Sequence, residues 1–177
     1  VLGVKNGGHF SQGASTITQQ LLKNAVFNVG ADESTFAESL KRKIQEQYLA
    51  WQLEKQMDKS EILEYYLNII NLGNNTLGVQ AASNSYFGKS VSELSLSECA
   101  VIAAITQNPT KYNPIRHPDN NKEWRLEVLD KMKKKGDITQ AEYDEAIADS
   151  DAVYERIGAV SVDNEEPSYY TYFVDEL

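Results

Sequence analysis

The spacing of apolar and polar positions along the chain predicts helices throughout. Apolar residues recur on helical faces, and no stretch alternates convincingly between apolar and polar positions, as a half-buried strand would. Capping-box pairs, in which Ser, Thr, Asp or Asn is followed three residues later by Glu, mark helix starts. These pairs are Thr35 and Glu38, Asp58 and Glu61, Ser95 and Glu98, Asn120 and Glu123, and Thr139 and Glu142. We therefore expect an all-α fold.

About seven helices are expected. The first begins at a cap on Ser15 or Thr16 and ends near Phe27, and the second runs from Thr35 to about Met57. The others are expected at 58–73, 81–88, 95–109, 120–136 and 139–149, the first four of these closed by Gly73, Gly88, Pro109 and Gly136. The run CAVIAAI is apolar nearly all round, which predicts a buried helix with Cys99 as a small buried hydrophobe.

Charge is distributed unevenly over the 177 residues. The net charge is −9, but Asp137 to Leu177 hold twelve acidic residues and one basic residue, so the rest of the chain has a small positive excess. An anionic ligand can bind there, but nothing indicates the long basic surface that nucleic acid requires. The stretch 151–177 is acidic with a weak helix pattern. It is expected to be a linker toward a following domain, with a docked tail as the alternative.

Several function classes are excluded by what the sequence lacks. CAVIAAI is the longest apolar run and is far shorter than the roughly 20 residues that span a bilayer. The single cysteine excludes an internal disulfide framework, and neither His9 nor His117 has partners at metal-ligand spacing. No protein metal site is therefore expected.

The helix expected after Thr35 carries a carboxylate in an unusual setting. On a helical wheel, Glu46 falls inside an apolar stripe, with Arg42 one turn earlier and Lys43 three residues earlier. A poorly hydrated carboxylate beside two cations suits a catalytic or ligand-facing role. The alternative is an ordinary ion pair on a solvated flank of the helix.

The segment QGASTITQQLLKN, residues 12–24, gives the first helix a polar start. A helix start offers free N–H groups and partial positive charge, which favour an anion such as phosphate. Ser15 and Thr16 add hydroxyls, while Gln20 and Lys23 follow on nearly the same face. With Arg42 and Lys43, these groups suit a pyrophosphate. The alternative is a simple helix cap.

The helix after Asp58 contains Tyr65, Tyr66 and Asn68 close together. These side chains either line a sugar site or pack against the rest of the fold, and the sequence does not decide between the two.

Four segments in order resemble the second to fifth motifs of the peptidoglycan glycosyltransferases of glycosyltransferase family 51, the polymerase domain of class A penicillin-binding proteins. They are QGASTITQQLLKN, RKIQEQYLAWQLEK, EILEYYLNIINLG and RLEVLDKM. The sequence from Gly78 to Pro114 resembles the core that connects them, so the resemblance covers nearly the whole chain. In the second motif, Gly13 and Ala14 stand where the family usually has two glycines.

The resemblance implies a lysozyme-like helical fold with a small membrane-facing lobe, acting on the extracytoplasmic face of the cell membrane. The implied substrates are lipid II and the growing glycan chain: the 4-hydroxyl of lipid II attacks the anomeric carbon of the chain with inversion. The phosphoglycolipid moenomycin is the implied inhibitor. Residues 1–150 would form the glycosyltransferase domain, and 151–177 would lead toward a transpeptidase domain.

Site residues follow from the motifs. By resemblance, Glu46 corresponds to the glutamate that assists the pyrophosphate leaving group, directly or through a divalent metal such as Mg²⁺. The positions that match donor phosphate and sugar binding are Ser15, Thr16, Gln20, Lys23, Arg42 and Lys43. Tyr66 and Asn68 would support the sugar cleft.

The first motif of the family has no counterpart in the chain. That motif supplies the glutamate that deprotonates the acceptor hydroxyl, and residues 1–12 contain no Asp or Glu. We therefore expect a domain lacking its N-terminal part, with little polymerase activity in these 177 residues.

Two other functions fit parts of the sequence. A lytic transglycosylase or lysozyme-like hydrolase would use one glutamate on finished glycan and would not need the cations Lys23, Arg42 and Lys43. A non-catalytic helical interaction module would use the polar motif only as a helix cap.

Overall fold

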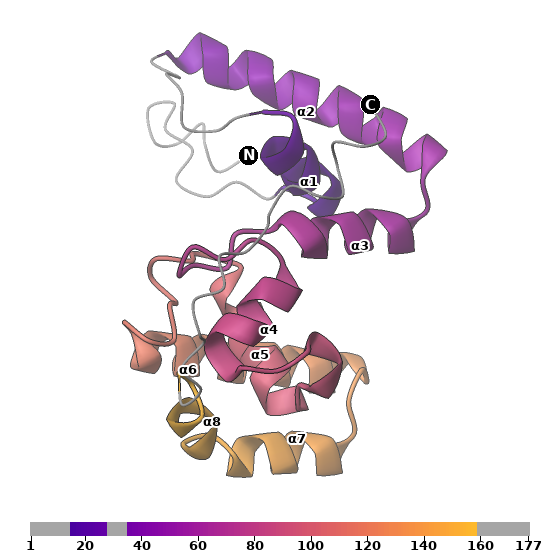
Figure 1. Cartoon of the computed structure of the whole chain (residues 1–177). Helices are drawn as coiled ribbons and strands as arrows, with labels where there is room; N and C mark the ends of the chain where they lie inside the picture. Colours follow the sequence, from indigo (N-terminus) through magenta and orange to yellow (C-terminus); the bar gives the residue numbers. More distant parts are fainter. Residues whose placement is uncertain (1–14, 28–34, 159–177) are drawn as a thin grey trace. The chain divides into compact units, whose positions relative to one another are not determined.

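The computed structural model of the chain describes residues 15–27 and 35–158, and it is helical (Figure 1). Within these ranges the only β pairing is an isolated bridge between Asn71 and Leu77, so the all-α expectation is confirmed. No helix in this part of the chain combines the length and apolarity needed to cross a membrane. The chain divides into two compact units, Val1–Gln80 and Ala81–Leu177.

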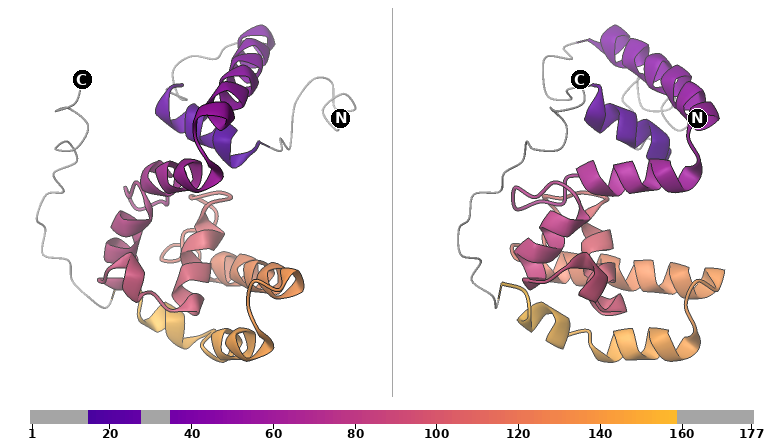
Figure 2. Two further views of the ribbon diagram at one scale, coloured as in Figure 1. Left: turned by 90° about the vertical axis from the view of Figure 1, so that its right-hand side faces the viewer. Right: turned by 45° about the vertical axis from the view of Figure 1, so that its right-hand side comes forward.

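The first unit is built from α1 (Ile17–Ala25), α2 (Phe36–Gln56) and α3 (Lys59–Ile69). α1 packs against both α2 and α3 and lies between them (Figure 2). The predicted capping boxes at Thr35 and Asp58 form, and Thr16 rather than Ser15 caps α1, with Gln19 completing a capping box there. These local hydrogen bonds satisfy N–H groups that the first turns would leave free.

The end of α3 differs from the prediction. The helix stops at Ile69, because Ile70 is already extended, and Gly73 does not close it. Gly73 instead lies in a tight turn with φ +76°, and the turn brings the Gly78 N–H to the Ile70 carbonyl at 2.8 Å. A Cβ on Gly78, whose φ is +83°, would lie 2.4 Å from the Asn68 carbonyl oxygen. Glycine is therefore required where this turn packs on α3.

The second unit contains most of α4 (Val79–Phe87), the 3₁₀ turn η2 (Val91–Glu93), α5 (Leu96–Ile105), α6 (Pro118–Lys135), α7 (Gln140–Ala148) and α8 (Ala152–Glu155). α5 is the buried helix that the sequence predicts, and it packs against α6 and α7. Ala100, Leu129, Ile138 and Ala146 form a buried core cluster among these helices.

Two expectations for this unit are wrong. Cys99 is exposed, although the residues after it in the run are mostly buried. α6 begins at Pro118, with His117 as its N-cap, and not at the Asn120 capping box. Proline at the first helical position needs no N–H partner and has a helical φ, so it starts the helix earlier. The αL Gly136 ends α6 as predicted.

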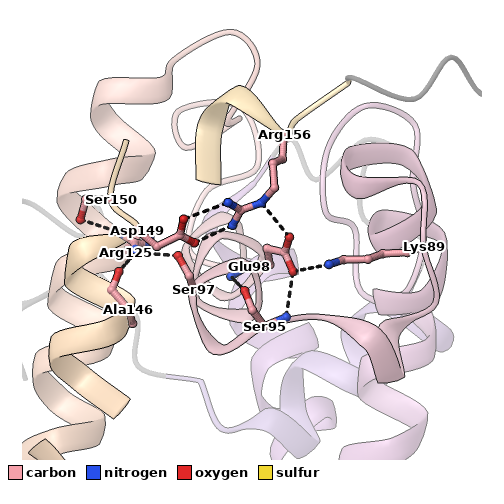
Figure 3. Close-up of polar contacts among 9 residues, drawn as sticks. All are labelled: Lys89, Ser95, Ser97, Glu98, Arg125, Ala146, Asp149, Ser150 and Arg156. Atoms are coloured by element: carbon pink, nitrogen blue, oxygen red, sulfur yellow. Dashed lines mark hydrogen bonds and ion pairs between the residues drawn. The ribbon is translucent and has the colours of Figure 1, made fainter. Parts of the chain in front are cut away.

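A buried carboxylate joins three segments of the second unit (Figure 3). Glu98 is 1% exposed, and Lys89 Nζ contacts its Oε2 at 2.7 Å, while Arg156 Nε contacts its Oε1 at 3.1 Å. Burial works to raise the pKa of Glu98, but bonds from Lys89, the Ser95 N–H and Arg156 outweigh it and leave the pKa lowered. Arg156 also binds Asp149 through two hydrogen bonds, which lowers the pKa of Asp149.

Arg125 is a fully buried cation in the same unit. It donates to Ser97 Oγ at 2.8 Å, to Ser150 Oγ at 3.0 Å and to the Ala146 carbonyl oxygen (Figure 3). Burial lowers the pKa of Arg125 from its usual value. These bonds connect α6 to α5 and to the end of α7, so Arg125 holds the unit together.

The chain is packed up to the last described residues. Val153 of α8 is fully buried, and Gly158 N–H donates to the Tyr86 carbonyl at 3.0 Å. The boundary expected near residue 150 and the linker role of the acidic stretch stay predictions. Most of that stretch, and the residues 1–12 that lack an acidic side chain, lie outside the described residues.

Candidate functional site

Glu46 is buried on the inner face of α2. It is 1% exposed, and Ala50, one turn further along the same face, is 5% exposed. The opposite face carries the exposed residues Ile44 and Tyr48. The alternative of an ion pair on a solvated flank is therefore wrong. A carboxylate in this position needs partners, because an unpaired buried charge is strongly destabilising.

Both oxygens of Glu46 are occupied by cations from the preceding turn. Arg42 Nη1 contacts Oε1, and Lys43 Nζ contacts Oε2 at 2.6 Å. The Arg42 side chain is 15% exposed, whereas that of Lys43 is 44% exposed. Lys43 can therefore receive a ligand from solvent while it stays bound to Glu46, and the three groups together carry one net positive charge.

Lys43 also connects this cluster to the start of α1. Its Nζ donates to Ser15 Oγ at 3.3 Å. Thr16 Oγ1 accepts from the Gln19 N–H at 3.2 Å, so the hydroxyl of Thr16 serves as a cap. This cap uses the Thr16 hydroxyl and the Gln19 N–H, and it does not involve the Ser15 hydroxyl or Lys43. Capping and anion binding therefore do not exclude each other here.

Gln20 extends the connection to α3. Its Nε2 donates to the Ser15 carbonyl oxygen at 3.3 Å, and its Oε1 accepts from Tyr66 Oη at 3.1 Å. Tyr66 is 7% exposed, and burial raises its pKa, so the phenol stays protonated and donates. A continuous set of polar contacts thus runs from Tyr66 through Gln20, Ser15 and Lys43 to Glu46. The Tyr66 ring is thus buried within the unit and joins this set, and its role at a sugar stays a prediction.

Two predicted site residues do not join it. Lys23, in the last turn of α1, is half-buried and pairs with no carboxylate of the described residues. Asn68 is exposed, and its side chain makes no polar contact with the other predicted site residues. Tyr65 is likewise exposed at 48%. Their roles at a ligand stay predictions.

One further contact was not expected from the sequence. Glu54 accepts a hydrogen bond from Thr18 Oγ1 at 2.6 Å. Thr18 is 6% exposed. The sequence offered two signals: Thr18 lies two residues after the cap of α1, and Glu54 lies eight residues after Glu46. Neither signal indicates that these two side chains contact each other. In contrast, Glu61 caps α3 as predicted, and Glu64 is exposed.

No group of three or more His, Cys, Asp or Glu side chains among residues 15–27 and 35–158 is placed to bind a metal ion. Glu46 is the one acidic side chain in the contact set from Tyr66 to Arg42, and cations occupy both of its oxygens. The contact set alone therefore offers a metal few ligands.

Comparison with known proteins gives the same assignment as the motifs. A family model described as transglycosylase matches residues 2–133, most of the chain. The chain belongs to the transglycosylase family. The matched region contains all the residues of the contact set and continues through most of α6.

Two named relatives of the chain are both penicillin-binding protein 1A. The chain is 48% identical over 146 residues to penicillin-binding protein 1A of Clostridium botulinum, covering 80% of this chain and 17% of that protein. It is 39% identical over 171 residues to penicillin-binding protein 1A of Streptococcus oralis, covering 97% of this chain and 26% of that protein. A crystal structure of penicillin-binding protein 1A from Haemophilus influenzae matches at 45% identity with a TM-score of 0.49, over 51% of this chain and 14% of the other. The chain thus spans 14–26% of the length of these proteins.

Proposed function

We propose that the chain is the peptidoglycan glycosyltransferase domain of a larger penicillin-binding protein, and that it takes part in polymerising lipid II into glycan strands. The observation that carries this proposal is the shared position of Lys43, which contacts buried Glu46 on α2 and Ser15 at the start of α1. Family membership supplies the reaction class, and this cluster supplies a place for the pyrophosphate of the donor.

The charges suit a pyrophosphate. Arg42 and Lys43 both contact Glu46, so these three groups together carry a positive excess, and the start of α1 adds N–H donors. Lys43 is the more exposed cation and is the group we propose to contact a phosphate oxygen first. Ser15, Thr16 and Gln20 would hydrogen-bond the phosphates and the adjacent sugar, and Lys23 would bind from the same helix. Tyr66 would support them from α3 through Gln20.

Glu46 would act on the leaving pyrophosphate. As the 4-hydroxyl of lipid II attacks the anomeric carbon, the bond to the pyrophosphate breaks and negative charge grows on the departing oxygen. Arg42 and Lys43, held by the two oxygens of Glu46, are placed to stabilise that charge. A bound Mg²⁺ would supply further positive charge at the same pyrophosphate. The base that takes the proton of the acceptor hydroxyl is expected from the first motif.

The exposed face of α2 suits a membrane surface. Leu40, Ile44, Tyr48 and Trp51 are 45–60% exposed, and Lys55 Nζ lies 3.1 Å from the centroid of the Trp51 ring. Aromatic and aliphatic side chains with a lysine at their edge are typical of helices that lie in a lipid interface. We propose that this face contacts the outer leaflet, where the lipid-linked substrate is held.

Two assays on the same preparation test the function. The chain is incubated with fluorescent lipid II in detergent and, separately, with purified peptidoglycan. Saturable binding of lipid II that moenomycin displaces, with no release of muropeptides, is the expected result. Muropeptide release would contradict it and favour the hydrolase. Absence of any binding to lipid II or moenomycin would favour a non-catalytic module.

A further inference from the structure

Glu54 connects the far part of α2 to the first turn of α1. Although Glu54 lies on an exposed part of the helix, its Oε1 accepts from Thr18 Oγ1 at 2.6 Å, and Thr18 is 6% exposed. The contact therefore fixes the position of Thr18 relative to α2.

A second contact holds the start of α1 from another point on α2. Lys43 Nζ donates to Ser15 Oγ at 3.3 Å. Residues 43 and 54 lie about three turns apart, roughly 16 Å along the helix axis, whereas Ser15 and Thr18 lie within one turn of each other. Two attachment points so far apart on α2 restrict both sliding and rotation of the α1 start.

The first turn of α1 carries the N–H donors of the proposed pyrophosphate site. The Gln19 N–H donates to Thr16 Oγ1 and the Gln20 N–H to the Thr16 carbonyl, while the N–H groups of Ile17 and Thr18 have no acceptor among the described residues. Thr18 therefore has both an N–H in this first turn and a side chain that Glu54 holds. Rotation of this turn would change the direction in which that N–H points and would move Ser15 relative to Lys43.

We propose that Glu54 is a positioning residue for the donor site, acting through Thr18. It orients the α1 start so that the N–H groups of the first turn, Ser15 and Lys43 can bind one anion together. The proposal rests on the function proposed above for the cluster. In this proposal Glu54 contacts Thr18 and not the anion. Its effect on anion binding therefore depends on its ability to accept the hydrogen bond from Thr18 and not on its negative charge.

The test is moenomycin affinity, measured by isothermal titration on the 177-residue chain, with thermal melting of each variant recorded alongside. Glu54→Ala and Thr18→Val are each expected to weaken binding about fivefold. The double variant is expected to be no weaker than either single one, because both changes remove the same contact. Glu54→Gln and Thr18→Ser keep an acceptor and a hydroxyl, so both are expected to bind like the wild type. Gln56→Ala, an exposed site in the same last turn of α2, is the control.

Several results would overturn the proposal. They are wild-type affinity in Glu54→Ala, tighter binding in Glu54→Gln than in the wild type, and additive losses in the double variant. If Glu54→Ala does not fold, the comparison of Thr18→Val with Thr18→Ser decides alone: equal affinities would refute the proposal. Lys43→Ala separates this inference from the proposed function, since wild-type affinity in that variant would refute the anion site itself.

Discussion

Replacing Glu46 by glutamine should strengthen the binding of an anionic donor mimic. The substitution keeps the shape of the side chain but removes the one negative charge that Arg42 and Lys43 now share. In the wild type, an incoming phosphate meets two cations already contacted by a carboxylate. In Glu46→Gln the same cations have no carboxylate between them, so the phosphate gains their full attraction and loses a nearby repulsion.

The contact distances set the magnitude. Lys43 Nζ lies 2.6 Å from Glu46 Oε2, and a phosphate oxygen on the other side of the ammonium would lie at about 2.8 Å from it. The two anions would then be at least ~4 Å apart, where their repulsion is about 1 kcal/mol in a water-like dielectric and about 4 kcal/mol at an effective dielectric of 20. Because Lys43 is 44% exposed, we take the lower value, which corresponds to about fivefold in affinity.

The assay is titration of moenomycin into the wild type and Glu46→Gln at two salt concentrations, with Glu64→Gln as the control for loss of an exposed carboxylate. Glu46→Gln should bind about fivefold more tightly, and the gain should shrink at high salt because screening weakens the repulsion that is removed. Affinity equal to or weaker than that of the wild type would refute the reasoning that the phosphate lies beside Glu46.

Three further outcomes follow from single contacts. Gly78→Ala should lower the free energy of unfolding, measured by urea titration, by about 2–4 kcal/mol. Gly136 also has a positive φ but open space around it, so Gly136→Ala should lower the free energy of unfolding by only about 1 kcal/mol. Equal losses in the two variants would contradict the steric argument. Because the pKa of Glu98 is lowered from 4.5, its contribution to stability is present above pH 4.5 and is lost as the pH falls through the lower folded value. Arg156→Gln should make this acid-induced loss of stability shallower, and an unchanged pH profile would contradict the ion pair. Tyr66→Phe leaves Gln20 without its donor and should cost about 1 kcal/mol in stability, measured as a lower melting temperature; an unchanged melting temperature would argue against the bond.

Local signals in the sequence predicted most of the helices well. α2 was expected from Thr35 to about Met57 and runs over Phe36–Gln56, because the capping box at its start depends only on residues close in sequence. The start of α6 was missed because two local signals compete there. Pro118 begins a helix without any side-chain cap, and the later Asn120 pair falls inside it.

Contacts between helices were predictable only in part. The apolar stripe around Glu46 indicated its burial, since the helical wheel fixes which residues share a face. The wheel does not determine which residue of another helix lies opposite, so the bonds from Lys43 to Ser15 and from Thr18 to Glu54 could not be predicted. Cys99 shows the same limit, because an apolar run does not indicate which of its positions faces solvent.

The most direct test of the donor site is the dissociation constant of moenomycin for Lys43→Ala compared with Lys41→Ala. Both lysines lie on α2, but Lys41 is exposed and only Lys43 contacts Glu46 and Ser15. A charge-assisted bond to phosphate contributes about 1.5–3 kcal/mol, so Lys43→Ala should bind at least about tenfold more weakly than the wild type and Lys41→Ala should bind equally well. Equal affinities for the two variants would contradict the assignment of this cluster as the pyrophosphate site.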